Sequence, residues 1–147
     1  MTSHAWTCTI PGQPVGKGRP RVVRAGTGMR AFTPERTARW EAGAALVLRS
    51  EWAGPPLEAP DRLHIEAVFA RPERLVCRHK RACQCDPGRQ PHRARPDSDN
   101  LAKTVGDSVV QAGVVVDDAR IPDWSIAKRY AAQGEAPHVL VRLEWTA

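Results

Sequence analysis

The chain has 147 residues, four cysteines and a net charge of +6 at neutral pH. This length suits one domain with an ordinary core. The apolar runs are far shorter than the ~20 residues that cross a bilayer, and the first residues lack a basic-then-apolar signal pattern. We therefore expect a cytoplasmic protein without a membrane partner, whose cysteines are reduced or bound to metal. The positive charge favours a polyanionic partner such as nucleic acid.

Two short strands are predicted before the first helix. Residues 6–10 alternate weakly between apolar and polar side chains, and residues 29–32 form a second short strand. Between them, residues 16–21 have the sequence Gly-Lys-Gly-Arg-Pro-Arg, which is typical of a flexible basic loop.

A helix is predicted from residue 34 to about residue 52. Thr33 is a good N-cap, and Pro34 suits the first helical position. Apolar side chains then recur at helical spacing, at Trp40, Ala44, Leu48 and Trp52. After a break at residues 54–56, the alternation over residues 63–69 predicts a half-buried strand.

Residues 71–96 form a basic segment without periodicity. Eight arginines and lysines face two acidic residues there, a net charge of +6 that equals the charge of the whole chain. Long loops in a compact domain are usually functional or disordered. Both interpretations remain open: a DNA-contacting loop and a solvated insertion.

The C-terminal part predicts one more helix and three strands. The helix runs from Ser98 to about Ala112 and ends at Gly113, and the strands cover residues 114–116, 124–131 and 138–145. The order of elements predicts a single α+β domain over residues 1–147, with two main helices and a mixed or mostly antiparallel sheet.

Three thiols and two imidazoles gather within residues 77–92. Tetrahedral zinc takes four nitrogen or sulfur ligands, which Cys77, Cys83, Cys85 and His92 could supply. The spacing lacks the paired knuckle of a zinc finger, so a mobile basic loop with uncoordinated cysteines is the alternative.

Carboxylates crowd the start of the second predicted helix. Asp97 and Asp99 flank its first turn, and Asp117 and Asp118 follow the short strand after it. Any one of them could be a simple cap. Together they form the oxygen-only donor set that suits Mg²⁺, and Lys103 could supply the positive charge that phosphodiester cleavage requires. The alternative for Lys103 is an i,i+4 salt bridge with Asp99 or Asp107.

The order of these residues resembles the signature of the RusA family of Holliday junction resolvases. The family pattern is matched by a first acidic motif and, after a short strand, by a second one. The matching positions are Pro96, Asp97, Asp99, Asn100, Leu101, Lys103 and Asp107, then Asp117, Asp118 and Ile121. Residues 16–21 are similar to the N-terminal basic loop of the family, and Lys128 matches a recurrent lysine.

The resemblance implies a homodimeric, Mg²⁺-dependent endodeoxyribonuclease that nicks four-way DNA junctions symmetrically, with Mn²⁺ as a substitute ion. It implies that Asp97, Asp99 and Asp118 bind the metal, with Asp117 as a further candidate, and that Lys103 is catalytic. Asn100 and Asp107 match supporting positions. The implied DNA-binding residues are Lys17, Arg19, Arg21 and Lys128. Such an enzyme would be associated with the nucleoid. Two other functions stay open: a non-catalytic DNA-binding module, and a nuclease that acts on forks or flaps.

Overall fold

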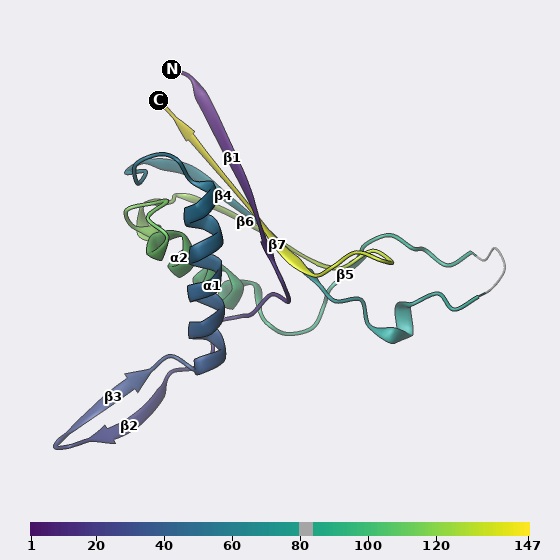
Figure 1. The fold of residues 1–147 in the computed structure, drawn as a ribbon, viewed down its shortest axis with the longest axis horizontal. Helices are drawn as coiled ribbons and strands as arrows, with labels where there is room; N and C mark the ends of the chain where they lie inside the picture. The colour runs from purple at the N-terminus through teal and green to yellow at the C-terminus, as the bar shows by residue number, and fades with distance from the viewer. Residues whose placement is uncertain (80–83) are drawn as a thin grey trace.

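The computed structural model describes residues 1–79 and 84–147 and contains a five-stranded sheet in the order β1-β7-β4-β6-β5 (Figure 1). Its long strands are β1 (Ser3–Pro11), β4 (Pro60–Phe69), β6 (Asp123–Tyr130) and β7 (His138–Thr146), and β5 (Gln90–Pro91) is short. Strands β4 and β6 are parallel, and the other neighbours are antiparallel. The predicted α+β fold with a mixed, mostly antiparallel sheet is confirmed.

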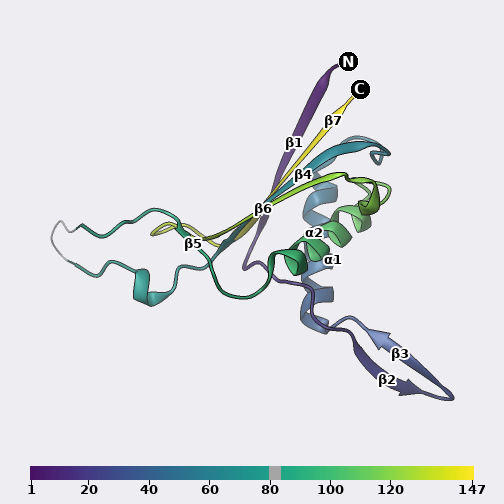
Figure 2. The same ribbon diagram turned by 180° about the vertical axis from the view of Figure 1, so that it is seen from behind.

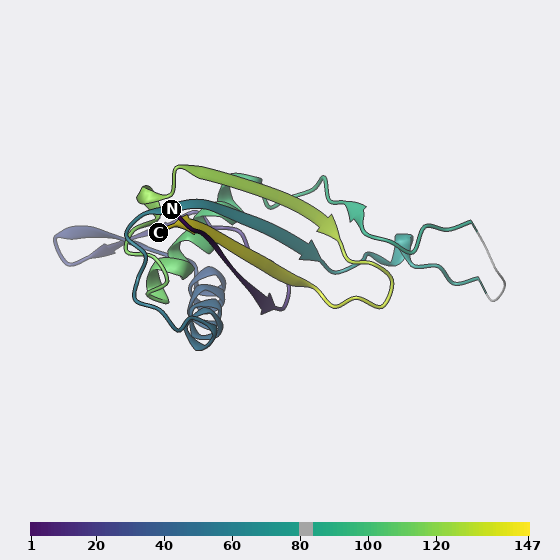
Figure 3. The same ribbon diagram turned by 90° about the horizontal axis from the view of Figure 1, so that it is seen from above.

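Two helices, α1 (Glu35–Glu51) and α2 (Ser98–Gln111), pack on one face of this sheet (Figure 3). Leu48 of α1 and Val109 of α2 are fully buried against Leu63 of β4 and Val141 of β7. Each such side chain contributes about 1.5–3 kcal/mol by leaving water. The helices are therefore fixed to the sheet through the apolar faces that the sequence predicts.

The ends of the helices follow the sequence closely. The first helix begins at Glu35, so Pro34 rather than Thr33 is the N-cap residue, and it makes no side-chain cap hydrogen bond. Helix α2 ends at Gln111, and Gly113 follows with a φ of 73°. Glycine is favoured there because a Cβ disfavours the left-handed conformation that ends many helices.

Two strand predictions need correction. Residues 29–32 do form a strand, β3 (Gly28–Phe32), but it pairs with β2 (Arg21–Ala25) in an exposed hairpin that the sequence analysis did not predict. The prediction of a strand at residues 114–116 is wrong. Val115 makes only an isolated parallel bridge with Leu57. Val114 and Val115 are buried in the core, which accounts for their apolar side chains without a strand.

Two segments project from the body in opposite directions, the β2–β3 hairpin and the arm, defined here as residues 71–89 between β4 and β5 (Figures 1 and 2). The described part of the arm includes a short 3-10 helix, η1 (Glu73–Leu75). Lys80, Arg81 and Cys83, which belong to the basic segment of the sequence, lie outside the described residues. In the chain as described, no helix is both long and apolar enough to span a membrane.

The segment around residues 16–18 is not a free loop, because it lies against both helices. The backbone N–H of Lys17 donates to the carbonyl of Asn100 at 2.9 Å, and that of Gly18 donates to Oγ1 of Thr37 at 3.1 Å. A Cβ placed on Gly16 would lie 2.5 Å from Cβ of Pro96. Glycine is thus required at residue 16 for the close approach to the start of α2.

This contact predicts opposite effects of two glycine substitutions. Gly16→Ala should lower the free energy of unfolding by about 1–3 kcal/mol, because the backbone must move away from Pro96. Gly43→Ala is the matched control: Gly43 lies inside α1 with no atom near its missing Cβ, so the change should raise stability by roughly 0.5–1 kcal/mol. Urea denaturation of both variants measures the difference. Equal effects would show that the contact at residue 16 does not constrain the fold.

Candidate active site

The start of α2 presents a carboxylate that does not cap the helix. Asp97 is the N-cap residue, with φ −69° and ψ 153°, but its side chain makes no cap hydrogen bond. An aspartate that served only as a cap would accept a hydrogen bond from the backbone of the first turn. The exposed Asp97 carboxylate is therefore available to a ligand.

One face of α2, which we call the acidic face, contains Asp99, Lys103, Gly106 and Asp107. Nζ of Lys103 lies 3.4 Å from Oδ2 of Asp99, and both side chains are more than 60% exposed. Such an exposed i,i+4 pair stabilises a helix by only a few tenths of a kcal/mol. Lys103 can therefore leave Asp99 at little cost.

Asp118 approaches the acidic face from the short 3-10 helix η2 (Asp118–Arg120). Its Oδ2 lies 2.9 Å from the position that a Cβ on Gly106 would take, so the absence of a side chain at residue 106 lets the Asp118 carboxylate lie against the helix. Partial burial raises the pKa of the Asp118 carboxyl, and the negative charges of Asp107 and Asp117 raise it further. Crowded carboxylates of this kind favour a cation among them.

The adjacent Asp117 has a different role in the fold. Its Oδ1 accepts a hydrogen bond of 3.0 Å from the backbone N–H of Ala119, which makes it the cap of η2. The resemblance implied Asp118 as a metal ligand, with Asp117 as a further candidate, and in the structure Asp118 is the one whose carboxylate lies against α2.

The predicted metal ligands are aligned rather than gathered at one point. Asp118 lies against α2 at Gly106, which is seven residues beyond Asp99. Seven helical residues span about 10 Å along the helix axis. Among the described residues, Asp97, Asp99 and Asp118 do not form a three-carboxylate group compact enough to surround one ion. Their chemistry still fits Mg²⁺, which takes oxygen ligands, usually keeps several waters and needs only one or two protein carboxylates.

Lys17, one of the predicted DNA-binding residues, forms ion pairs with two carboxylates. Its Nζ lies 2.7 Å from Oε1 of Glu41 on α1 and 2.5 Å from Oδ2 of Asp107 on α2. Burial lowers the pKa of Lys17, but the hydrogen bonds from Asp107 and Glu41 outweigh it and leave the pKa raised. Because Glu41 is buried, its charge requires this partner. Lys17 thus joins the two helices beneath the acidic face.

Two other predicted DNA-binding residues, Lys128 and Arg21, lie in strands. Nζ of Lys128 donates to the carbonyls of Ala94 and Pro96 at 2.7 and 2.8 Å, so it fixes the backbone that leads into Asp97. Arg21 begins β2 of the projecting hairpin and is not part of a flexible loop. Their contact with DNA stays a prediction.

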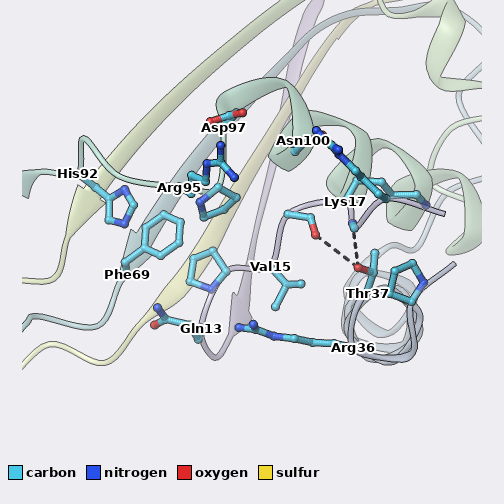
Figure 4. A pocket seen from close by; sticks show the side chains of 16 residues that line it. Gln13, Val15, Lys17, Arg36, Thr37, Phe69, His92, Arg95, Asp97 and Asn100 are labelled. Atoms are coloured by element: carbon cyan, nitrogen blue, oxygen red, sulfur yellow. Dashed lines mark hydrogen bonds between the residues drawn. The ribbon is translucent and has the colours of Figure 1, made fainter. Parts of the chain in front are cut away.

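A pocket of about 690 Å³ opens beside Asp97 (Figure 4). Three exposed arginines line it, Arg19, Arg36 and Arg95, and the side chain of Asn100 contributes to its wall. Figure 4 shows Asp97 and Arg95 at one rim and Arg36 at the other. The pocket combines positive charge with a free carboxylate at its edge, which is the electrostatic pattern expected for a phosphate backbone held beside a reacting centre.

His92 closes this pocket and is not placed with the cysteines. Its ring stacks on Phe69 at a centroid distance of 3.9 Å and lies 4.6 Å from Tyr130. Burial lowers the pKa of His92, and the charge of Lys128 adds to the effect. In the described part of the chain, the metal-compatible group is Cys77, His79 and Cys85. The predicted ligand set that included His92 is therefore corrected, and Cys83 lies outside the described residues.

Three residues of functional interest were missed from the sequence: Glu41, Arg36 and His79. Glu41 sits four residues from Thr37 and seven from Leu48, on the apolar stripe of α1, where a carboxylate needs a buried partner. His79 is only two residues from Cys77, a closer neighbour than His92. Arg36 gave no signal, because an exposed arginine in a first helical turn is ordinary.

An arginine-lined pocket with the Asp97 carboxylate at its edge fits a protein that acts on the backbone of a nucleic acid. Residues 11–144 match the family model described as Endodeoxyribonuclease RusA, so the chain belongs to that family. It is accordingly an endodeoxyribonuclease, and the predicted family is confirmed. A search of curated proteins found no match.

The two neighbouring basic residues Lys17 and Arg19 should respond differently to substitution. Lys17→Ala leaves the buried Glu41 without a counter-charge and should destabilise the fold by about 2–3 kcal/mol. This is less than for a fully buried pair, because 24% of the Lys17 side chain is exposed. Arg19→Ala should change stability by less than about 0.5 kcal/mol, as is usual at an exposed site. Thermal and urea unfolding of the two variants test this. Similar stabilities would contradict the structural role given to Lys17.

Proposed function

We propose that the protein resolves four-way DNA junctions as a homodimer, using Mg²⁺ to make paired symmetric nicks during recombination and repair in the cytoplasm. Family membership supports the DNA-cleaving activity. The observation that carries the proposal is the Asp97 carboxylate, which makes no cap hydrogen bond at the edge of an arginine-lined pocket.

The pocket gives the DNA strand a path to the carboxylates. Arg19, Arg36 and Arg95 come from three different segments, so they can hold successive phosphates rather than a single one. Arginine binds phosphate with two parallel hydrogen bonds, which fix position as well as supply charge. A strand held in this way would pass Asp97 and reach the acidic face of α2.

Asp97, Asp99 and Asp118 are the residues that would bind metal, with one or two of them at any one ion, because they are not close enough together to surround the same ion. When bound, the ion supplies positive charge beside the phosphate and increases the acidity of a bound water. The raised pKa of Asp118 is consistent with this role, since a carboxylate crowded by Asp107 and Asp117 gains most from a nearby cation. Asp107 itself is paired with Lys17, so its carboxylate is fixed in position near Asp118.

Lys103 would act on the phosphate. Its exposed ammonium has only the weak pair with Asp99, and it stands on the acidic face between Asp99 and Gly106. Turning toward a bound phosphate would place its charge where negative charge develops on the leaving oxygen. Lys103 therefore loses only a weak ion pair when it turns away from Asp99, and it gains a phosphate as its partner when DNA is bound.

A dimer follows from the symmetry of the substrate. Each chain carries a single set of the carboxylates, while a four-way junction needs two equivalent cuts. A two-fold homodimer supplies two equivalent sites.

The first test is substitution of the carboxylates. Asp97→Asn, Asp99→Asn and Asp118→Asn should each lower Mg²⁺-dependent cleavage of a synthetic four-way junction by at least about 100-fold, while junction binding is kept or strengthened. Each change preserves size but removes one charge from the metal site. Lys103→Ala should also abolish cleavage. The assay compares junctions, forks, flaps and linear duplex, with Mg²⁺ and with EDTA, and maps whether cuts fall on opposed strands.

Asp117→Asn is the matched control, because it removes a charge from the neighbouring position while asparagine caps as well as aspartate. It should keep most of the cleavage activity. Robust cleavage by the Asp99 and Asp118 variants would reject the mechanism. Preferential cleavage of forks or flaps would retain the nuclease but change its substrate.

The second test addresses the pocket. Changing Arg19, Arg36 and Arg95 together to Gln should weaken junction binding and reduce the slope of log K against log salt concentration by about 2–3, close to one for each lost phosphate contact. Arg142→Gln is the control, because Arg142 alternates with the buried Val141 and Leu143 and so faces away from the helices. The slopes are measured by fluorescence anisotropy over a salt series in Ca²⁺ or EDTA. An unchanged slope in the triple variant would place DNA elsewhere.

A further inference from the structure

The arm brings two thiols and one imidazole together at a distance from the carboxylates. The ligand atoms of Cys77, His79 and Cys85 lie within 4.8 Å of one another. Nδ1 of His79 is 3.5 Å from Sγ of Cys77 and also 3.5 Å from Sγ of Cys85. One imidazole nitrogen thus stands between two sulfur atoms that are separated by eight positions in the sequence.

These distances are those of ligands around a tetrahedral zinc ion. With Zn–S of about 2.3 Å and Zn–N of about 2.0–2.1 Å, a tetrahedral angle places the nitrogen and sulfur about 3.5 Å apart. The two sulfur–nitrogen distances agree with this value. Sulfur and imidazole ligands also select zinc over Mg²⁺, which prefers oxygen.

The arm has a structural reason to bind a metal. None of its described residues from 73 to 79 and from 84 to 89 is buried, so this part has no hydrophobic core. Its base is well anchored: the Arg71 guanidinium donates to the carbonyls of Leu75, Asp86, Gly88 and Ala131. Nδ1 of His79 and the two sulfurs lie beyond this anchor. A metal can supply the folding free energy that a segment without a core lacks.

A second anchor holds the backbone of the first cysteine. Gln133 accepts a hydrogen bond from the N–H of Cys77 and donates one to the carbonyl of Cys77, at 3.2 and 3.3 Å. Cys77 is thereby fixed to the turn between β6 and β7, which orients one ligand before any metal binds. Preorganisation of a ligand lowers the cost of binding.

We propose that Cys77, His79 and Cys85 bind one Zn²⁺ ion that holds the two sides of the arm together. His79 takes the place that spacing alone assigned to His92, whose ring is enclosed between Phe69 and Tyr130. This site is separate from the carboxylates and does not rest on the proposed cleavage mechanism. Its role is to hold the basic arm in one shape, so that its arginines face the solvent in fixed positions.

The experiment measures zinc on the full chain without DNA. Protein purified without chelator is analysed for metal content, then stripped and titrated with Zn²⁺ against a competing chelator. Wild type should hold about one zinc per chain. Cys77→Ser, His79→Ala and Cys85→Ser should each weaken zinc binding by at least about 100-fold. Replacement by Co²⁺ should give the sulfur-to-metal charge-transfer absorption and intense visible bands of a tetrahedral thiolate site, which each variant should lose.

Two histidine variants are the controls. His92→Gln and His138→Ala should bind zinc as wild type does, because neither side chain belongs to the group of three. Cys83→Ser is included because Cys83 lies outside the described residues: weaker binding would make it the fourth ligand, and unchanged binding would leave that position to water. The proposal is overturned if the wild type takes up no stoichiometric zinc, or if His92→Gln abolishes binding while His79→Ala keeps it.

Discussion

The structure depends on one buried charge and its partner. Glu41 points from α1 into the space between the helices, where a lone carboxylate would be strongly unfavourable. Lys17 neutralises it and reaches Asp107 at the same time, so a single ammonium group links the N-terminal segment to α1 and α2. The hydrogen bond from the Lys17 N–H to Asn100 and the close contact of Gly16 with Pro96 follow from that placement. These contacts hold the start of α2, and with it Asp97, against the N-terminal segment.

The same ammonium also balances an electrostatic conflict. Asp107, Asp117 and Asp118 lie near one another, and the pKa of Asp118 is raised first by partial burial and further by the charges of the other two. Lys17 pairs with Glu41 and Asp107 but not with Asp118, and Asp99 has only its weak, exposed pair with Lys103. Negative charge therefore remains where a cation is expected to bind, and it is neutralised where a carboxylate is buried. A protein selected for stability alone would gain from removing this excess.

Local patterns predicted most of the fold, and long-range contacts explain what was missed. The helices over residues 35–51 and 98–111, and strands β4 and β7, carry clear periodicity, because each has one face in the core. The β2–β3 hairpin has no buried face, so only β3 was predicted, and neither β2 nor the pairing of the two strands was. The acidic motif identified Asp97, Asp99, Asp118 and Lys103 as candidates. The partners of Lys17 and Lys128, and the exchange of His79 for His92, depend on which segments meet in space, and spacing along the chain does not determine that.

The pairing of β1 with β7 has a consequence for how the molecule is made. Ser3 pairs with Thr146 and Pro11 with His138, so the first and last strands of the sheet are neighbours. Contacts between residues so distant in sequence carry a large loop-closure cost and slow the folding reaction. During synthesis, β1 stays unpaired until β7 has left the ribosome. The apolar side chains of β1 are exposed meanwhile, which makes this strand a segment that a chaperone can bind.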